Sequence, residues 1–299
     1  MKASVIAKSI SYPGTSPFPV TITTFELEYP RFIHAELMTH HALFKNCASS
    51  RAIPTKKLIE QVRNNPAMPV HWGANQAGMQ AHKELSKPLQ VAAKYLWIKA
   101  AKAAAGMALA MHKVGLHKQI VNRVLEPFQM MKTVVTATEW ENFYWLRDHE
   151  DAQPEFQHLA RMMKEATAKV APELLVPGQW HVPYVKTEFI PGLGRQYYDE
   201  NGNSISVEQA LKLSASCCAQ TSYRATDKSQ DKAEVIFDKL INSEPVHASP
   251  TEHQATPMRP GGGWEKGVTH QDRAGFFWSS GLKGWIQHRQ LIPNNCKKG

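Results

Sequence analysis

Residues 46–51, Asn-Cys-Ala-Ser-Ser-Arg, form a short polar cluster whose side chains could bind an anion. Ser49 and Ser50 offer hydroxyl donors, and the Arg51 guanidinium can form two parallel hydrogen bonds to phosphate oxygens. The structural alternative is a solvated turn before Pro54, because short polar turns are common. The cluster therefore predicts a phosphate site, with a plain turn as the open alternative.

The segment that leads into this cluster, residues 31–44, is predicted to be helical. Pro30 suits the start of a helix because its missing N–H would have no partner there. Apolar side chains supply one buried side of the helix: Phe32, Ile33, Leu37 and Met38. The adjacent His40 and His41 follow, and both are mostly neutral at pH 7.

The whole stretch resembles the signature of the flavin-dependent thymidylate synthases, in which Pro-x-Phe is followed by Arg-His-Arg and by Asn-Glu-x-Ser-x-Arg. The matching residues are Pro30, Phe32, His40, Asn46, Ser49 and Arg51. Thr39 and His41 stand where the family has arginines, and Cys47 stands where it has glutamate. Cys47 is interpreted as a small buried thiol.

Two further blocks resemble the family at the same spacing. Residues 138–155, preceded by Arg123 and Pro127, resemble its helix ending in Phe-x-x-Leu-Arg, with matches at Asn142, Phe143, Leu146, Arg147, Ala152, Gln153 and Glu155. Residues 219–253 resemble its first block, with matches at Ser222, His247, Ser249, Pro250, Glu252 and His253. Because that first block lies near the C-terminus here, the resemblance implies a circularly permuted, divergent, phage-like member, a rearrangement that folds tolerate when their termini lie close together.

The resemblance implies a single α+β domain over residues 1–299, with a mixed central sheet flanked by long helices and a helical insertion at about 66–118. It implies FAD as cofactor and methylation of dUMP to dTMP, with methylenetetrahydrofolate as carbon donor and NADPH as reductant. The flavin carries the hard chemistry, so the protein mainly orients its ligands. The implied assembly is a homo-oligomer, a tetramer with active sites shared between subunits.

The resemblance also implies which residues bind the nucleotide. Ser49, Ser50 and Arg51 are assigned to its phosphate, and Arg123 to a further contact. Arg147 is the catalytic candidate, because a guanidinium at a uracil carbonyl stabilises negative charge that develops on the ring. The structural alternatives are an ion pair of Arg147 with Asp148 or Glu150, and an exposed helix position for Arg123.

A separate set of residues is assigned to the flavin. It comprises His40, His41, Asn142, Ser222, His247, Ser249, Glu252 and Arg289. Arg289 enters because Gln287-His288-Arg289 is similar to Arg-His-Arg and could replace the missing charges, with a surface helix end as the alternative. No metal site is expected, because residues 247–253 lack the His-Glu-x-x-His spacing that places two imidazoles on one helical face.

Two other functions stay open. The altered residues 39–41 allow hydroxymethylation of dUMP or dCMP in place of methylation. A net charge of +9 and a pI near 9.3 favour anionic partners and allow a non-catalytic protein that binds nucleotides or nucleic acid. The chain has no basic run of five or more residues, so nucleic acid is not the expected partner.

The composition is that of an ordinary globular protein, with 42% apolar and 20% charged residues. Four cysteines without a Cys-x-x-Cys pair suit a reducing cytoplasm, that of the host if the source is viral. No export signal is visible. Residues 91–112 are the most hydrophobic stretch, but Lys94, Lys99 and Lys102 interrupt it, which favours an Ala-rich helix over a membrane span.

Periodicity and capping signals place the elements that must position these residues. A strand is predicted over 19–28. Besides 31–44, a helix is predicted over 55–64 with Thr55 as cap, and a long helix or a helix pair over 79–117. Further helices are predicted from a capping box at Thr138 through Arg147, over 154–170, from Ser206 and Gln209 towards Cys218, and over 230–242. Residues 65–80, 172–205 and 257–275 are predicted to be irregular, with strand-like pieces at 180–190 and a glycine loop at 261–263.

Overall fold

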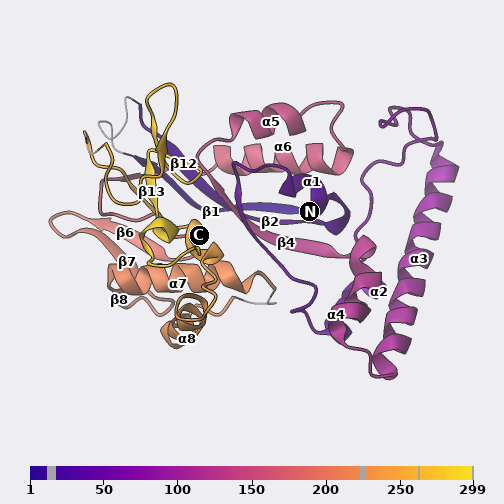
Figure 1. The fold of residues 1–299 in the computed structure, drawn as a ribbon. Helices are drawn as coiled ribbons and strands as arrows, with labels where there is room; N and C mark the ends of the chain where they lie inside the picture. Colours follow the sequence, from indigo (N-terminus) through magenta and orange to yellow (C-terminus); the bar gives the residue numbers. More distant parts are fainter. Residues whose placement is uncertain (12–17, 223–225, 262, 298–299) are drawn as a thin grey trace.

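The computed structural model describes residues 1–11, 18–222, 226–261 and 263–297. A five-stranded sheet crosses the molecule in the order β3-β4-β2-β1-β5 (Figure 1). The strands are β1 (Lys2–Ser11), β2 (Thr21–Pro30), β3 (Phe44–Cys47), β4 (Met130–Ala137) and β5 (Glu173–Leu175). The pair β1–β5 is parallel and the other pairs are antiparallel, so the predicted α+β class with a mixed central sheet is confirmed.

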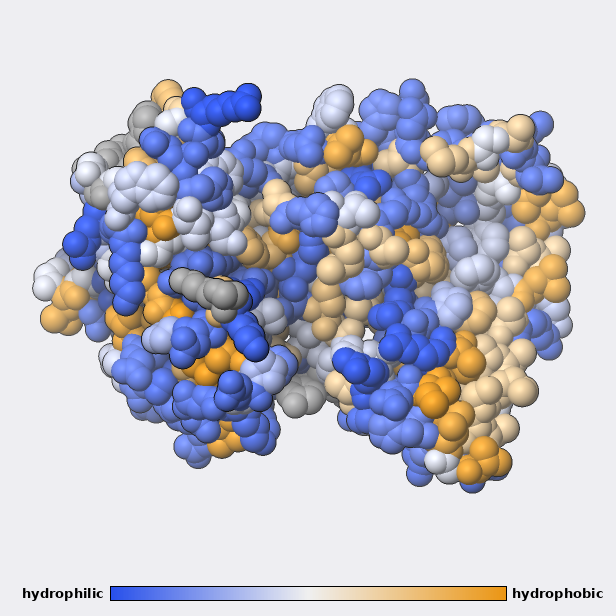
Figure 2. Space-filling view, in the orientation of Figure 1, coloured by the Kyte–Doolittle hydropathy of each residue, from blue (hydrophilic) through white to orange (hydrophobic). Residues whose placement is uncertain are grey.

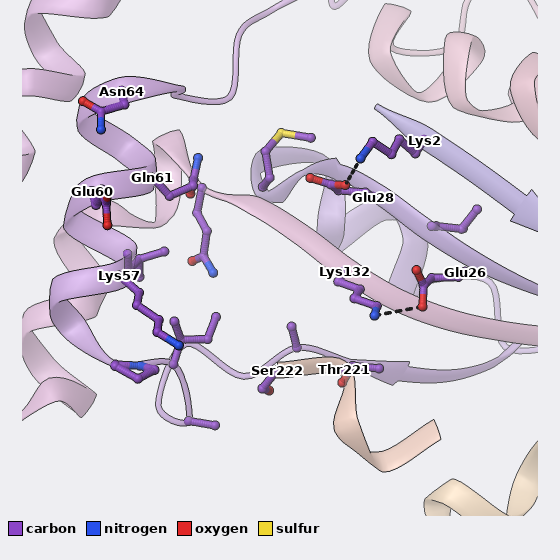
Figure 3. A pocket seen from close by; sticks show the side chains of 18 of the residues that line it. Lys2, Glu26, Glu28, Lys57, Glu60, Gln61, Asn64, Lys132, Thr221 and Ser222 are labelled. Atoms are coloured by element: carbon purple, nitrogen blue, oxygen red, sulfur yellow. Dashed lines mark ion pairs between the residues drawn. The ribbon is translucent and has the colours of Figure 1, made fainter. Parts of the chain in front are cut away.

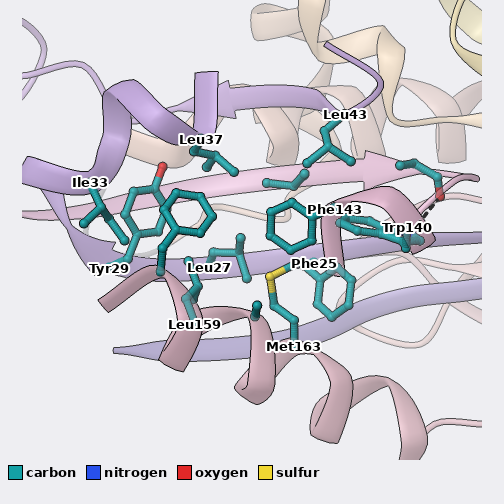
Figure 4. Close-up of a cluster of buried hydrophobic side chains, with 14 of the residues drawn as sticks. Phe25, Leu27, Tyr29, Ile33, Leu37, Leu43, Trp140, Phe143, Leu159 and Met163 are labelled. Carbon is teal, nitrogen blue, oxygen red and sulfur yellow. Dashed lines mark hydrogen bonds between the residues drawn. The ribbon is translucent and has the colours of Figure 1, made fainter. Parts of the chain in front are cut away.

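One face of the sheet is apolar because β2 alternates its side chains. Phe25, Leu27 and Tyr29 are fully buried on this face, beneath helices α5 (Glu141–Arg147) and α6 (Pro154–Ala168). Figure 4 shows Phe25 beside Trp140, with ring centroids 5.1 Å apart in an edge-to-face arrangement. This core fixes α5, and therefore Arg147 at its end, relative to the sheet.

The opposite face carries a buried chain of hydrogen bonds. Ser9 Oγ lies 2.9 Å from His181 Nδ1, and His181 Nε2 lies 2.8 Å from Thr24 Oγ1. Thr24 Oγ1 lies 2.7 Å from Thr136 Oγ1, which lies 2.8 Å from His253 Nδ1. Burial lowers the pKa of both histidines to about 3, so both are neutral links between the sheet and the segments that cover it.

A helical unit lies beyond one end of the sheet (Figure 1). It comprises α2 (Thr55–Asn64), α3 (Lys87–Lys113), α4 (Lys118–Val121) and the 3₁₀ helix η2 (Asn122–Phe128). Leu58, Ile59 and Val62 of α2 pack against a small-residue side of α3. No helix in the described residues is long and apolar enough to cross a membrane.

The remaining elements lie on the other side of the molecule. Helices α7 (Val207–Ala219) and α8 (Gln230–Ile241) pack together beside a small sheet of β6 (Lys186–Ile190), β7 (Gly194–Tyr198) and β8 (Ser204–Ile205). The 3₁₀ helix η3 (Gln220–Ser222) follows α7, and η4 (Ser249–Glu252) precedes β9. Five short strands come next, and η5 (His288–Leu291) follows the last of them; the strands are β9 (Ala255–Pro257), β10 (His270–Gln271), β11 (Phe277–Ser279), β12 (Leu282–Lys283) and β13 (Trp285–Gln287).

Several predicted elements are confirmed. Helix α2 covers the predicted residues, α6 begins at Pro154, and α8 lies at its predicted place. The capping box of α7 forms as predicted, because the Ser206 side chain accepts from the backbone of Gln209 and the Gln209 side chain accepts in return.

Other predictions were wrong. Residues 31–44 are not one helix: the 3₁₀ helix η1 (Arg31–Ile33) and α1 (His34–Met38) end before β3, which pairs with β4. Thr138 does not cap α5, because its hydroxyl accepts from the backbone N–H of Lys283 at 3.0 Å. Pro54, rather than Thr55, is the N-cap of α2, and α3 begins at Lys87. Strand β1 has no counterpart among the predictions.

Some predictions fall outside the described residues. These are residues 223–225 of the 219–253 block and Gly262 of the glycine loop. The permuted order and the single domain with an insertion at about 66–118 stay predictions.

Gly267 packs closely against Ile286 of β13, the strand that precedes Arg289. Its replacement by a larger residue is expected to destabilise the fold. Its φ is +97°, and an added Cβ would lie 2.6 Å from Ile286 Cγ2. Gly267→Ala should lower the free energy of unfolding by about 2–3 kcal/mol, combining backbone strain and overpacking. Gly275→Ala is the control, because its φ is +87° but the added Cβ would meet only Gln271 at 3.8 Å. Equal losses in urea unfolding would show that packing against Ile286 contributes nothing.

Candidate active site

Arg147 lies at the end of α5 in a tight set of contacts. Its Nε donates to His40 Nε2 at 2.8 Å, and its Nη1 lies 3.0 Å from Glu36 Oε2. The guanidinium carbon stands 4.7 Å from the ring centre of Phe156. Asp148, one of the alternative partners expected for Arg147, instead pairs with Arg161 and Lys164 of α6. The stacking on Phe156 and the two hydrogen bonds hold the planar group in one orientation.

His40 is kept neutral by its surroundings. Burial, followed by the charges of Arg147 and Lys45, lowers its pKa to about 4. Its ring meets Phe143 edge-on, with centroids 5.0 Å apart. A neutral imidazole can accept a hydrogen bond from Arg147 without adding a second charge, so the pair presents a single positive charge.

Lys45 of β3 links this pair to the C-terminal segments. Its Nζ donates to the backbone oxygen of His40 at 2.5 Å. The carboxylate of Glu252 in η4 pairs with Arg289 of η5. Burial raises the pKa of Glu252, while Arg289 and Lys45 oppose that rise. We call His40, Lys45, Arg147, Glu252 and Arg289 the basic cluster, which brings four distant parts of the chain together.

Four of the five remaining residues assigned to the flavin are exposed. Asn142 lies at the start of α5, and His41 lies in the turn before β3. His247 and Ser249 lie just before and in η4, the element that packs against β3. All four side chains therefore face solvent. Ser222, the fifth residue, is half-buried and accepts a hydrogen bond from the backbone of Ser49.

The serine loop, Ser49–Arg51, follows the other end of β3. The backbone N–H of Ser49 donates to Ser222 Oγ at 2.8 Å, and Ser50 Oγ donates to Glu126 Oε1 at 2.9 Å. Arg123 Nη1 lies 2.7 Å from the same oxygen of Glu126. The fold thus brings together four residues predicted from the sequence, but Glu126 already engages two of them. Arg51 is exposed.

A cleft of about 910 Å³ adjoins the serine loop, between α2 and the polar face of the sheet (Figure 3). We call it the α2 cleft. Its lining residues include Ala48, Ala52 and Ser222 but no member of the basic cluster. Figure 2 shows the surface hollowed between the part that contains α2 and the part that contains α7. Within one chain, the basic cluster and the serine loop therefore lie at opposite ends of β3.

Sequence reasoning missed several residues of these two groups. Lys45 belongs to the basic cluster and donates to His40. Glu36 and Phe156 touch Arg147 through contacts between distant segments, for which a single sequence holds no signal. Glu126 follows Arg123 by three residues, and this spacing on a helix could have revealed the pair.

Comparison with known proteins identifies the family. Residues 1–173, more than half of the chain, match the family described as thymidylate synthase complementing protein, and the chain belongs to this family. It is the family that the motifs resemble, so the predicted family and enzyme class are confirmed. The match includes the blocks at 30–51 and 138–155 and ends before the block at 219–253.

Two solved structures are partly similar to the chain. One is the UMP/dUMP methylase PolB from Streptomyces cacaoi bound with 5-Br UMP, at 17% identity and TM-score 0.46, covering 56% of this chain and 88% of that chain. Another is the flavin dependent thymidylate synthase ThyX from Helicobacter pylori complexed with FAD and dUMP, at 16% identity and TM-score 0.34, covering 49% and 67%. No curated protein sequence matches the chain.

Proposed function

We propose that this protein methylates dUMP to dTMP with FAD as cofactor, methylenetetrahydrofolate as carbon donor and NADPH as reductant. Family membership supports the reaction class. The observation that carries the proposal is the Arg147–His40 pair, a guanidinium oriented by a neutral imidazole and by Phe156. Such a fixed donor stabilises the charge that develops on a uracil carbonyl during attack at the ring.

The basic cluster is the part of the chain that fits a flavin. Lys45 and Arg289 supply two cations for the diphosphate, and Glu252 orients Arg289. When bound, the flavin supplies the electron transfer. The exposed side chains of His247, Ser249, Asn142 and His41 would contribute further hydrogen bonds at the rim of the cluster, whereas Ser222 lies beside the serine loop.

A second copy of the chain would complete the site. Arg147 and the serine loop lie at opposite ends of β3, and the α2 cleft beside the serine loop is lined by no residue of the basic cluster. In this proposal the serine loop of one copy binds the phosphate, with Arg123 released from Glu126, while Arg147 of another copy contacts the base. A closed homo-oligomer such as a tetramer repeats this arrangement by symmetry.

Arg289→Ala is expected to weaken FAD binding. Loss of a charge-assisted hydrogen bond costs about 1.5–3 kcal/mol, which corresponds to a dissociation constant about 10 to 100 times higher. Flavin fluorescence titration measures this constant. Arg259→Ala, at an exposed arginine 3.9 Å from Glu265, is the matched control. Arg289→Ala leaves the carboxylate of Glu252 without its partner, so the double variant Arg289→Ala/Glu252→Gln is made as well. It should show the same loss of FAD affinity as the single variant. Unchanged affinity in both the single and the double variant would remove Arg289 from the site.

Product analysis tests the reaction. The purified protein, supplied with FAD, dUMP, methylenetetrahydrofolate and NADPH, is expected to form dTMP. A hydroxymethylated nucleotide from dUMP or dCMP would replace the proposal with the related reaction. Salt-sensitive nucleic-acid binding without turnover would favour a non-catalytic role.

A further inference from the structure

Helix α3 stands at the outer edge of the molecule and packs on the rest of the chain with one side (Figure 1). This inward side consists of small residues, because Ala101, Ala105 and Ala108 are fully buried beside α2 and η2. The helix has 27 residues and is therefore about 40 Å long. A helix that packs on its own chain with one side is expected to be polar on the side that faces solvent.

A side of α3 that faces solvent is apolar instead. One row of residues repeats every seven positions and consists of Leu89, Leu96, Ala103 and Ala110. A second row lies four residues further along and consists of Ala93, Ala100, Met107 and the C-cap Val114. The large side chains are well exposed, Leu89 to 55%, Leu96 to 65% and Met107 to 59%. Figure 2 shows apolar surface along the part of the molecule that contains α3.

The spacing of the two rows is that of a coiled coil. Steps of four and three residues alternate along the helix, and the resulting period of 3.5 keeps all eight side chains on one stripe. We call these eight residues the α3 seam. Four of them are alanines, so a second helix could lie close to α3. Single apolar side chains on a surface need no partner, but a regular stripe of this length marks an interaction site.

The charges beside the α3 seam are all positive. Helix α3 contains five lysines and no acidic residue. Lys99 and Lys113 directly precede seam residues, at the flanking position where coiled coils carry the charges that decide partner choice. None of the five lysines forms an ion pair with a described acidic residue. Their charges are therefore available to a partner.

The helical unit that presents the α3 seam carries the net charge of the chain. Residues 51–128 contain 12 lysines and arginines and 3 acidic residues, a difference of +9. The whole chain contains 35 and 26, which is the same difference, so the other residues sum to zero. A positive field over this unit attracts an acidic partner before contact.

A second copy of the chain fits the α3 seam poorly. Two antiparallel α3 helices would place Lys99 and Lys113 of one copy against the lysines of the other, and like charges at such positions are destabilising. Helix α8 carries three acidic residues, but it exposes Val235 alone among its large apolar side chains, all of which the structure describes. Nucleic acid would engage the lysines and leave Leu89 and Leu96 uncovered.

We infer that the α3 seam binds an acidic amphipathic helix of another protein. The apolar side chains of the partner pack on Leu89, Leu96 and Met107, and its carboxylates pair with Lys99 and Lys113. This is the partner that uses both the apolar stripe and the positive charges beside it. No seam residue belongs to the basic cluster or the serine loop, so the inference stands whether or not the chain methylates dUMP.

The test uses the full chain and two synthetic helical peptides of four heptads. The acidic peptide has leucine at both seam positions of each heptad and glutamate at the flanking positions, and the basic peptide has lysine in place of glutamate. Fluorescence anisotropy should show that the acidic peptide binds at least about tenfold more tightly than the basic peptide. Added salt should weaken the acidic peptide, because the flanking charges are exposed.

Substitutions in α3 connect this binding to the seam. Leu96→Asp should weaken the acidic peptide about tenfold or more, because it places a carboxylate in the apolar contact. Val91→Asp is the matched control, since it makes the same change of charge at a position of α3 that is 68% exposed and outside the seam. Both variants should keep the melting temperature of the parent protein, because both positions are exposed.

A second pair of variants tests the charges. The double variant Lys99→Glu/Lys113→Glu should reverse the preference, so that the basic peptide binds more tightly than the acidic one. Lys94→Glu/Lys102→Glu makes the same change of charge on α3 away from the flanking positions, and it should retain the preference of the parent protein.

Several outcomes would overturn the inference. One is equal binding of the two peptides, and another is an equal loss in Leu96→Asp and Val91→Asp. Dissociation of the parent oligomer by Leu96→Asp in sedimentation would assign the seam to a second copy. Binding of anionic vesicles or duplex DNA, lost in Leu96→Asp, without binding of the acidic peptide would assign it to lipid or nucleic acid. Absence of turnover with intact peptide binding would instead count against the proposed function alone.

Discussion

Replacing Arg147 by alanine is expected to lower the rate of dTMP formation about 100- to 1,000-fold, the usual cost of removing one fixed donor from developing negative charge. Arg147→Lys should be almost as slow, because an ammonium group cannot donate to His40, pair with Glu36 and stack on Phe156 at once. Steady-state kinetics should show the loss mainly in kcat, since the contact strengthens in the transition state.

The control for this prediction is Arg161→Ala on the neighbouring helix. Arg161 is a half-exposed arginine whose Nε lies 2.8 Å from Asp148 Oδ1, outside the basic cluster. Arg147→Ala and Arg161→Ala should both keep nearly the melting temperature of the parent protein. A slow Arg161→Ala variant, or an Arg147→Lys variant with full kcat, would show that Arg147 acts as a structural residue.

Acid should destabilise the fold strongly through the buried histidines. His181 and His253 have a pKa of about 3 in the folded chain, because burial disfavours the charged imidazole. In the unfolded chain each titrates near about 6.5. As the pH falls below that value, the unfolded state takes up protons that the folded state refuses, so the free energy of unfolding falls. At pH 5 the loss is about 2 kcal/mol for each histidine, or about 4 kcal/mol for both.

Urea unfolding at pH 7.5 and pH 5.0 measures this loss. His253→Gln, which retains a polar side chain beside Thr136, should reduce the difference between the two pH values by about 2 kcal/mol. His149→Gln changes an exposed histidine and should leave the difference unchanged. A difference that is equally large in His253→Gln would assign the acid sensitivity to other groups.

The fold could be predicted from the sequence where local signals decide. The spacing of Leu58, Ile59 and Val62 marks α2, and Ser206 with Gln209 marks the start of α7. Strand β3 was missed because it has only four residues and owes its conformation to pairing with β4, a contact between distant segments.

The candidate site, like the fold, could be predicted where local motifs decide and not where contacts between distant segments decide. The resemblance assigned Ser49, Ser50 and Arg123 to the nucleotide and Ser222 to the flavin, whereas the structure places all four together around Glu126 and η3. Their roles in binding stay predictions. The contact of Arg147 with His40 joins residues 107 positions apart, so no local pattern could predict it.

The most direct test of the whole account mixes two inactive variants. Arg147→Ala and Arg51→Ala, each assembled alone with FAD, should form almost no dTMP from dUMP, methylenetetrahydrofolate and NADPH. If the site joins Arg147 of one copy to the serine loop of another, unfolding the two variants together and refolding them as mixed oligomers should restore dTMP formation. Mixed oligomers as inactive as either variant, beside an active parent protein treated in the same way, would contradict the shared site.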